Sequence, residues 1–253
     1  MYRFQRNKAG RAYIPGSSLK GALRTVWLAA RILEETPSNR NFRQPDAKGR
    51  SVNPIPEENY VNLLRCNEKR ETDAVNSIFR GISVSDSEPI SDGALILCRK
   101  WDVHPDGGRH DINLIRECVC PNATIRFQVT LDQFLLNQRI TAESLMADIA
   151  VFVQFYRKHY LSHFTLPENA VDPLNDRCLF LGGGSGLFSK SLTYPYWGDA
   201  DGLEDVSAFL DVLFKGHKHV ARDRDFGISP RTLKYTEYKD HLYPFGIGQV
   251  SFQ

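Results

Sequence analysis

A proline–glycine break followed at once by an amphipathic helix pattern is the strongest local constraint in this sequence. Arg11–Thr25 reads RAYIPGSSLKGALRT, in which the proline fixes the backbone angle φ and the glycine accepts positive φ. Between Leu19 and about Glu35 apolar residues recur every three or four positions, which predicts a helix with one apolar face. We therefore expect a short strand before the break and a helix after it, capped by Ser17 and Ser18.

The first turn of this helix is predicted to bind an anion. Free N–H groups and the positive end of the helix dipole lie there, and Lys20 and Arg24, four residues apart, share the adjoining face. The first 24 residues contain six Lys or Arg and no Asp or Glu, which favours phosphate. A nucleotide P-loop is excluded, because Ala22 and Leu23 stand where Lys and Ser or Thr are required. On spacing alone, a capped helix with two solvated cations is an equal alternative.

Composition narrows the class of protein. The 253 residues are 42% hydrophobic and 25% charged, which is ordinary for a globular chain with one large core or two small ones. No apolar run is long enough to span a membrane, and no signal-peptide core precedes the first motif. The five cysteines lack C-x-x-C spacing, so we expect reduced thiols in the cytoplasm and no metal or cofactor.

Charge is unevenly distributed along the chain, although the net charge is only +2. Residues 1–50 hold eleven Lys or Arg against three Asp or Glu, and Lys215–Lys239 hold seven against three. Basic faces on a nearly neutral protein favour a polyanion bound on one side. Thr36–Pro56 is polar and without apolar periodicity, so a long basic loop is expected there.

A second glycine element follows a short apolar strand. Cys178–Ser191 reads CLFLGGGSGLFSKS, which is not a dinucleotide fingerprint, because Leu187 occupies the last glycine position of G-x-G-x-x-G. Its glycines let the backbone approach a ligand closely, and its hydroxyls and lysine suit phosphate oxygens. A tight turn packed against another strand is the alternative. The candidate residues are Gly182, Gly183, Gly184, Ser185, Ser189 and Lys190.

Periodicity predicts the remaining elements. Helices are expected at Glu57–Phe79, Ala142–Leu161 (capped by Thr141) and Leu203–Phe214. Strands are expected at Ile82–Ser85 paired with Ala94–Trp101, and at Ala123–Leu131, Pro230–Tyr238 and Leu242–Phe252. Trp101–Asp111 is expected to be a polar loop.

Several stretches resemble the RAMP proteins of type III CRISPR systems. They read IPGSSLKGALR from Ile14, FRGISVSDSEPI from Phe79 and LGGGSGLFSKS from Leu181, with PRTLKYT and LYPFGIG in the tail. ECVCPNATIRF also resembles the family's E-x-x-x-P-G-T-x-F-x-F, with Asn122 in the glycine place, where Asn tolerates positive φ. The glycine-rich loop and tail are most similar to the fifth Csm subunit, which caps the 3′-end region of the CRISPR RNA (crRNA) in type III-A complexes.

The resemblance implies an α+β fold of ferredoxin-like (RRM-like) modules, with antiparallel sheets and helices on one face. It divides the chain into an N-terminal module, 1–135, and a C-terminal module, 136–253, which carries the glycine-rich loop. Family members begin with a strand and a long segment before the first motif. Here the motif starts at Ile14, so the first strand of the first module is expected to be missing.

In function, the resemblance implies a non-catalytic crRNA-binding structural subunit. It would cap the crRNA 3′-end region, contact neighbouring Csm backbone and small subunits, and support crRNA maturation by other nucleases, host nucleases among them. No membrane partner is implied. The residues carried over as crRNA contacts are Gly16, Ser17, Ser18, Lys20, Arg24, Gly182, Gly183, Gly184, Ser185 and Lys190.

Two catalytic alternatives stay open. A RAMP endoribonuclease needs a general base and acid on either side of a 2′-OH, for which His104, His110 and Tyr13 are the candidates. The repeated backbone subunit would cut target RNA through a loop aspartate and a metal ion, for which Asp46 is the candidate.

Overall fold

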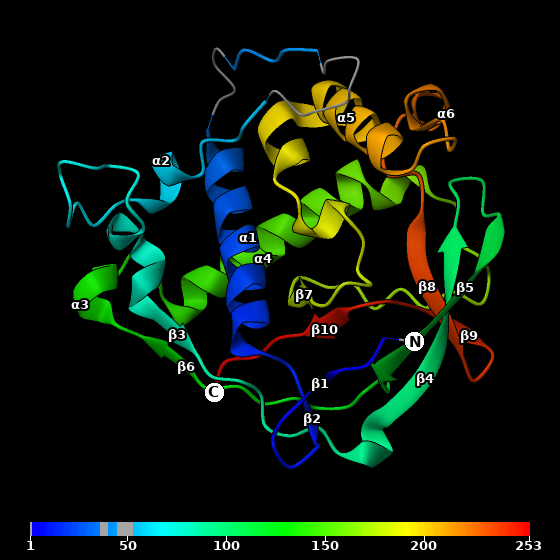
Figure 1. Ribbon diagram of the computed structural model, residues 1–253, viewed down its shortest axis with the longest axis horizontal. Coiled ribbons are helices and arrows are strands. Elements are labelled where there is room, and N and C mark those ends of the chain that lie inside the picture. The colour runs from blue at the N-terminus through cyan, green and yellow to red at the C-terminus, as the bar shows by residue number, and fades with distance from the viewer. Residues whose placement is uncertain (1, 36–39, 45–52) are drawn as a thin grey trace.

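The computed structural model describes residues 2–35, 40–44 and 53–253 of the chain (Figure 1). The α-helices are α1 (Gly16–Glu34), α2 (Glu58–Val61), α3 (Gln133–Leu136), α4 (Ala142–His159), α5 (Thr193–Leu213) and α6 (His219–Phe226). The strands are β1 (Gln5–Arg6), β2 (Ala12–Tyr13), β3 (Ile82–Val84), β4 (Leu95–Val103), β5 (Arg109–Val119), β6 (Val129–Leu131), β7 (Cys178–Phe180), β8 (Leu233–Tyr238), β9 (His241–Pro244) and β10 (Ile247–Gln249). Short 3-10 turns are η1 (Ala74–Asn76), η2 (Ile78–Gly81), η3 (Asp92–Ala94), η4 (Leu161–His163) and η5 (Phe188–Lys190).

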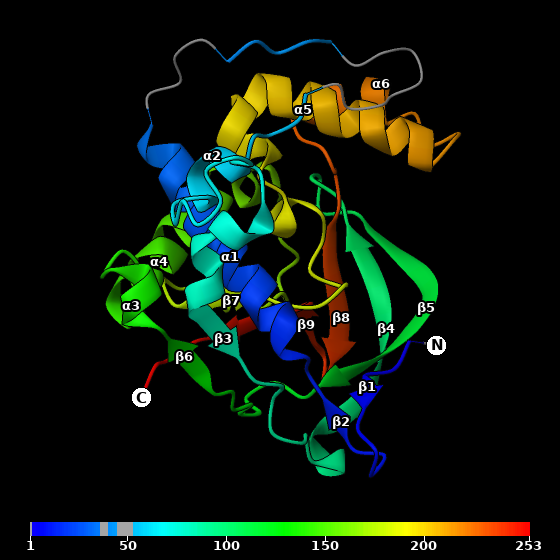
Figure 2. The ribbon, with the colours of Figure 1, turned by 60° about the vertical axis from the view of Figure 1, so that its left-hand side comes forward.

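The largest sheet among the described residues has the order β5-β4-β8-β9, with every pair antiparallel. β4 pairs with β5 along its length and with β8 through Trp101–Val103. β4 and β5 precede the predicted module boundary at residue 135 and β8 and β9 follow it, so strands from both sides share one sheet. Figure 2 shows this sheet on one side of α1 and α4, with α5 and α6 across one end. The α+β class is confirmed.

Helices α1 and α4 form the centre of the hydrophobic core. The predicted apolar face of α1 is buried, including Leu23, Val26 and Trp27. Helix α4 starts where the sequence predicts: the Thr141 hydroxyl accepts a hydrogen bond from the Ser144 amide at 3.1 Å, and the Ser144 side chain completes the capping box. Full burial of each large apolar side chain contributes about 1.5–3 kcal/mol, so the buried faces of these two helices stabilise the fold.

The start of α1 differs from the prediction. The helix begins at Gly16 rather than Leu19, and neither Ser17 nor Ser18 caps it. Instead the Gly16 amide donates to the Asp86 carboxylate at 2.9 Å. A Cβ at Gly16 would lie 2.3 Å from the Val84 carbonyl oxygen, so close backbone packing is what requires glycine here.

The strand pairing also differs. β3 was expected beside β4 but pairs with β6, with Ile82 opposite Leu131. The segment after β3 lies beside β2 instead, since the Ile90 amide donates to the Ala12 carbonyl at 2.8 Å. β4 turns back on β5 through 104–108, so most of the predicted polar loop Trp101–Asp111 is strand.

The predicted helix Glu57–Phe79 is wrong: these residues form α2 and the turns η1 and η2. Helix α5 starts ten residues earlier than predicted, at Thr193, and kinks at Gly198. Asn122 has φ of 67°, which confirms its place at a glycine position. The predicted loop Thr36–Pro56 lies largely outside the described residues. Among the described helices, none has the length and apolar character to cross a membrane.

We predict that Gly16→Ala destabilises the protein by about 2–3 kcal/mol, because the methyl group would overlap the backbone after β3. Gly21→Ala is the matched control. It lies in the same helix, a Cβ there meets nothing within 4 Å, and the change should stabilise by about 0.5–1 kcal/mol. Urea unfolding measures both values. Equal stability of the two variants would contradict the packing argument.

A second prediction concerns Asp148 on α4, which is buried and bonded to Arg31 of α1 at 2.6 Å. Burial raises the pKa of Asp148 to about 6, although the charge of Arg31 acts in the opposite direction. The folded pKa lies above the ordinary value of 3.8, so the folded state binds the proton more tightly. The unfolding free energy should therefore rise as pH falls from 7 through 6, by up to about 3 kcal/mol near pH 4.

Asp148→Asn should remove this contribution and Glu143→Gln, an exposed change on the same helix, should not. Urea unfolding between pH 4 and pH 7 compares the variants with the parent chain. A pH dependence that is the same in all three would show that Asp148 ionises normally.

Candidate nucleic-acid interface

The glycine-rich loop joins β7 to the turn η5 and presents backbone amides without partners. Its start is held by the Leu181 amide, which donates to the Gly246 carbonyl at 2.7 Å. Beyond that bond, the N–H groups of Gly183, Gly184 and Gly186 have no hydrogen-bond acceptor within the described part of the chain. Adjacent free amides on a loop form a concave site of partial positive charge that suits an anion.

Internal contacts fix the shape of this loop. Gly182 has φ of 78°, a conformation that disfavours other residues, and a Cβ at Gly184 would lie 3.0 Å from Phe245. The Ser185 hydroxyl donates to the Gly182 carbonyl at 3.2 Å, and the Ser189 hydroxyl donates to the Ser185 carbonyl at 2.9 Å. Ser189 is buried and cannot reach an external phosphate, contrary to the sequence-based expectation.

Two cations converge on the free amides. The Lys190 ammonium donates to the Gly182 carbonyl. The Arg116 guanidinium, on β5, lies 3.5 Å from the position that a Cβ would take at Gly183. The pKa of Lys190 is lowered, first by burial and then by the charge of Arg116. Neither cation has a carboxylate partner among the described residues.

The surroundings of Arg116 hold its side chain in place and leave one of its donors unpaired. Its side chain lies over the Tyr2 ring, 4.8 Å from the ring centroid, which fixes the guanidinium plane. Its Nε is buried and has no hydrogen-bond partner within the described residues. Such groups are costly unless something pairs with them. An anion at the loop would relieve the excess positive charge.

A second pair of lysines continues the positive surface past Gly186. The Lys234 side chain of β8 lies 4.0 Å from the position of a Cβ at Gly186. Lys234 and Lys100 share one carboxylate, that of Asp102, at 2.9 and 3.3 Å. The pKa of Lys234 is lowered to about 8, mainly by burial and also by the charge of Lys100, while Asp102 acts in the opposite direction. The sheet beside the loop therefore carries more positive than negative charge.

The cations of the first motif have internal partners. The Lys20 ammonium donates to the Ile82 carbonyl at 2.7 Å, and burial lowers the pKa of Lys20. Arg24 forms an ion pair with Glu57. The helix amide predicted to hold an anion is occupied by Asp86, while Ser17 and Ser18 are exposed. The cations of the first motif thus have partners within the chain, and their contact with RNA stays a prediction.

The two predicted elements nevertheless meet in space. Arg24 and Lys190 line the same cleft of about 490 Å³, together with Thr193 and Phe209 of α5. Glu57 neutralises the charge of Arg24, so the positive charge of the cleft lies on the side of Lys190. Lys190 therefore belongs both to the glycine-rich element and to this cleft.

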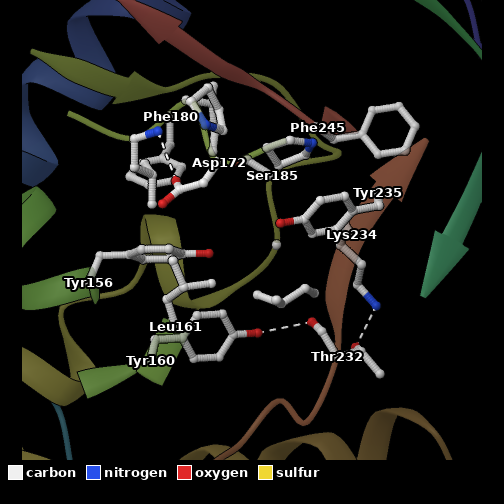
Figure 3. Close-up of a pocket in the computed structure, with 16 residues that line it drawn as sticks. Tyr156, Tyr160, Leu161, Asp172, Phe180, Ser185, Thr232, Lys234, Tyr235 and Phe245 are labelled. Carbon is white, nitrogen blue, oxygen red and sulfur yellow. Dashed lines mark hydrogen bonds between the residues drawn. The ribbon is translucent and has the colours of Figure 1, made fainter. Parts of the chain in front are cut away.

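The space beneath the loop is closed to nucleotides (Figure 3). Tyr156, Tyr160 and Tyr235 line it, with Ser185 of the loop on its wall, and its volume is about 20 Å³. That volume holds roughly one water molecule. The Tyr160 hydroxyl donates to the Thr232 carbonyl at 2.9 Å, and burial raises its pKa well above the ordinary value. A ligand of nucleotide size must therefore lie on the outer side of the loop.

The nuclease candidates are not brought together. Tyr13 lies in β2, which is bonded to Ile90 just before β4 begins, whereas His104 and His110 flank the turn at the far end of β4. β4 has nine residues, so about 30 Å separates them. Figures 1 and 2 both show β2 and the β4–β5 turn at opposite ends of the sheet. Asp46 lies outside the described residues. Among the described residues, no three His, Cys, Asp or Glu side chains gather to hold a metal ion.

Arg116, Lys100 and Lys234 escaped the sequence analysis. Each is a single basic residue in a strand, far in sequence from any glycine motif. Only the pairing of β4 with β5 and β8 places them beside the loop. The excess of basic residues in Lys215–Lys239 indicated a positive surface in this part of the chain, but it does not single out Lys234 among its neighbours.

Comparison with known proteins gives a consistent picture. The chain is 29% identical over 264 residues to the CRISPR system Cms protein Csm5 of Mycobacterium tuberculosis (strain CDC 1551 / Oshkosh), covering all of this chain and 67% of that protein. It is 32% identical over 202 residues to the protein of the same name from Streptococcus thermophilus, covering 79% of this chain and 51% of that protein. The chain thus spans between half and two thirds of these relatives.

The fold has a counterpart among solved structures, the crystal structure of T.onnurineus Csm5. The two superpose with a TM-score of 0.52 at 17% identity, over 98% of this chain and 73% of the other. A model of the RAMP superfamily matches residues 1–246. This chain therefore belongs to the RAMP superfamily.

Proposed function

We propose that this chain is a Csm5-type structural subunit of a type III-A CRISPR interference complex, and that it binds the crRNA in its 3′-end region without cutting it. The observation that carries the proposal is the convergence of Lys190 and Arg116 on the free amides of the glycine-rich loop. The identity of 29–32% to proteins named Csm5 supports the subunit type.

In this proposal the loop holds the sugar-phosphate backbone. The amides of Gly183 and Gly184 donate to phosphate oxygens, Arg116 adds a planar pair of donors, and Lys190 exchanges its bond to the Gly182 carbonyl for one to phosphate. Phosphate contacts fix the position of an RNA strand but carry no sequence information. That property suits a subunit that must hold guides of every sequence.

Absence of cleavage is part of the proposal. Cutting RNA without a metal needs a base and an acid within hydrogen-bond reach of the reacting groups. The separation of His104 and His110 from Tyr13 by the length of β4 favours a holding role over that chemistry. We further propose two ferredoxin-like modules, contacts to the Csm backbone and small subunits, and crRNA maturation by other nucleases, host nucleases included.

We predict that Lys190→Glu with Arg116→Glu lowers crRNA affinity by at least about tenfold and reduces the slope of log K against log salt by about 2, because two phosphate contacts are lost. Lys158→Glu, an exposed change on α4, is the matched control and should leave affinity nearly unchanged. Filter binding at several salt concentrations measures both effects.

Unchanged affinity in the double variant would place the RNA elsewhere on the chain. Cleavage of a CRISPR repeat RNA by the parent protein, lost in His104→Ala, would favour the endoribonuclease alternative instead.

The lowered pKa of Lys234 gives a prediction on pH. Below its pKa of about 8 the ammonium is charged and adds to phosphate binding, so affinity should be constant from pH 6.5 to 7.5 and fall above pH 8. The fall is at most tenfold per pH unit for one proton. Lys234→Arg keeps its charge throughout this range and should abolish the fall. The RNA should contain only the bases A and C, so that the bases themselves do not ionise in this pH range. The same decline in both proteins would exclude Lys234 as its source.

A further inference from the structure

The buried side of α5 continues past the core and is uncovered at the end of the helix. Val206 and Leu210 are buried. Phe209 and Leu213 follow three residues after Val206 and Leu210 and border the buried side, and Val212 lies three residues after Phe209; yet all three are exposed, Leu213 by 55%. In Figures 1 and 2, α5 and α6 lie at one end of the molecule. This end of α5 therefore presents apolar surface that the described residues leave uncovered.

One further aromatic side chain extends that surface. Phe214 directly follows α5 and is 52% exposed, and its ring lies 6.2 Å from the His219 ring at the start of α6. We call this set the α5-end patch; its members are Phe209, Val212, Leu213 and Phe214. Exposed apolar surface of this kind marks interaction sites in soluble proteins.

Exposed cations follow the α5-end patch closely in the chain. Lys215, Lys218 and Arg222 are exposed, and none of them forms an ion pair among the described residues. The carboxylates close to them in sequence are engaged: Asp211 accepts the first amide of α6, and Asp223 binds Arg231.

Asp225, at the end of α6, is the one carboxylate of 211–226 that has no internal partner in the described structure. Three free cations against one free carboxylate leave the edge of the patch positive.

We propose that the α5-end patch binds a second protein whose matching surface is apolar and edged with carboxylates. Interfaces of this type bury an apolar centre and surround it with charge-matched polar groups. The four apolar members would supply the centre, and Lys215, Lys218 and Arg222 would meet the carboxylates. The proposal rests on the proposed function in one respect: the partner is taken to be another subunit of the same Csm complex.

Two other occupants fit less well. A second copy of this chain would set the same positive edge against itself in a two-fold contact, which is repulsive. Single-stranded RNA is held by stacking bases on aromatic rings, whereas Val212 and Leu213, two of the four members of the patch, are aliphatic and offer no such face. Apolar burial with charge matching therefore favours a protein with an acidic edge.

The test uses Leu213→Asp with Phe214→Asp, because both side chains are exposed and the fold should tolerate the change. Phe134→Asp on α3, where the ring is 94% exposed, is the matched control. The probe is the assembly of the remaining Csm subunits and crRNA from the same genome, purified without this chain. Fluorescently labelled parent and variant chains are titrated against it. We expect the dissociation constant to rise at least about tenfold for the double variant and less than about twofold for the control.

Charge reversal tests the edge separately. Lys215→Glu with Lys218→Glu should slow association and reduce its dependence on salt, with little change in dissociation. Stopped-flow mixing of the same labelled chains measures both rates.

Each remaining outcome counts against one of the proposals. Parent-like binding by the double variant overturns the patch and leaves the proposed function intact. A dimer of the isolated parent chain that dissociates in the double variant assigns the patch to a second copy. Weaker binding to crRNA alone, with normal binding to the subunits, assigns it to RNA. A parent chain that binds neither crRNA nor the assembly overturns the proposed function and the patch together.

Discussion

The pairing of β4 with one strand next to it in the chain and one from a distant part of the chain is the constraint on which the rest of the structure depends. β5 returns from β4 through a hairpin, while β8 comes from near the C-terminus. Together they bring Arg116 and Lys234 beside a loop that neither strand contains. The Leu181–Gly246 hydrogen bond then fixes that loop on the sheet. The positive surface is therefore a product of tertiary pairing, and loss of β8 would separate its parts.

The first glycine motif shows how the start of a helix can find an anion within its own chain. The start of α1 does attract a carboxylate, as its dipole and free amides favour. The carboxylate belongs to Asp86, which lies there because the backbone of Val84 and Ser85 packs directly on Gly16. Asp86 thus takes the Gly16 amide, one of the donors that the sequence offered to phosphate. Lys20 of the same helix donates to the Ile82 carbonyl of β3.

The sequence predicts best those features that depend on residues close together in the chain. The start of α4 follows from Thr141 and Ser144, the positive φ of Asn122 from its turn, and the glycine-rich loop from its own composition. Strand partners are instead decided by contacts between distant parts of the chain. β3 and β6 are both short, so the alternation of their side chains would fit several other partners equally well. Arg116 became part of the candidate site only through such a partner choice, and no local pattern distinguishes it from any exposed strand arginine.

The glycine-rich loop and the α5-end patch rely on different forces, so salt should affect binding at the two surfaces differently. The glycine-rich loop attracts its ligand through charge and amide dipoles, which salt weakens and which ignore RNA sequence. The α5-end patch gains most of its energy from burial of apolar area, which salt does not weaken. Because the net charge is only +2, long-range attraction to RNA is small. Binding must then depend on the local geometry of the loop, so a protein contact that holds this chain beside the RNA raises the effective concentration of the site.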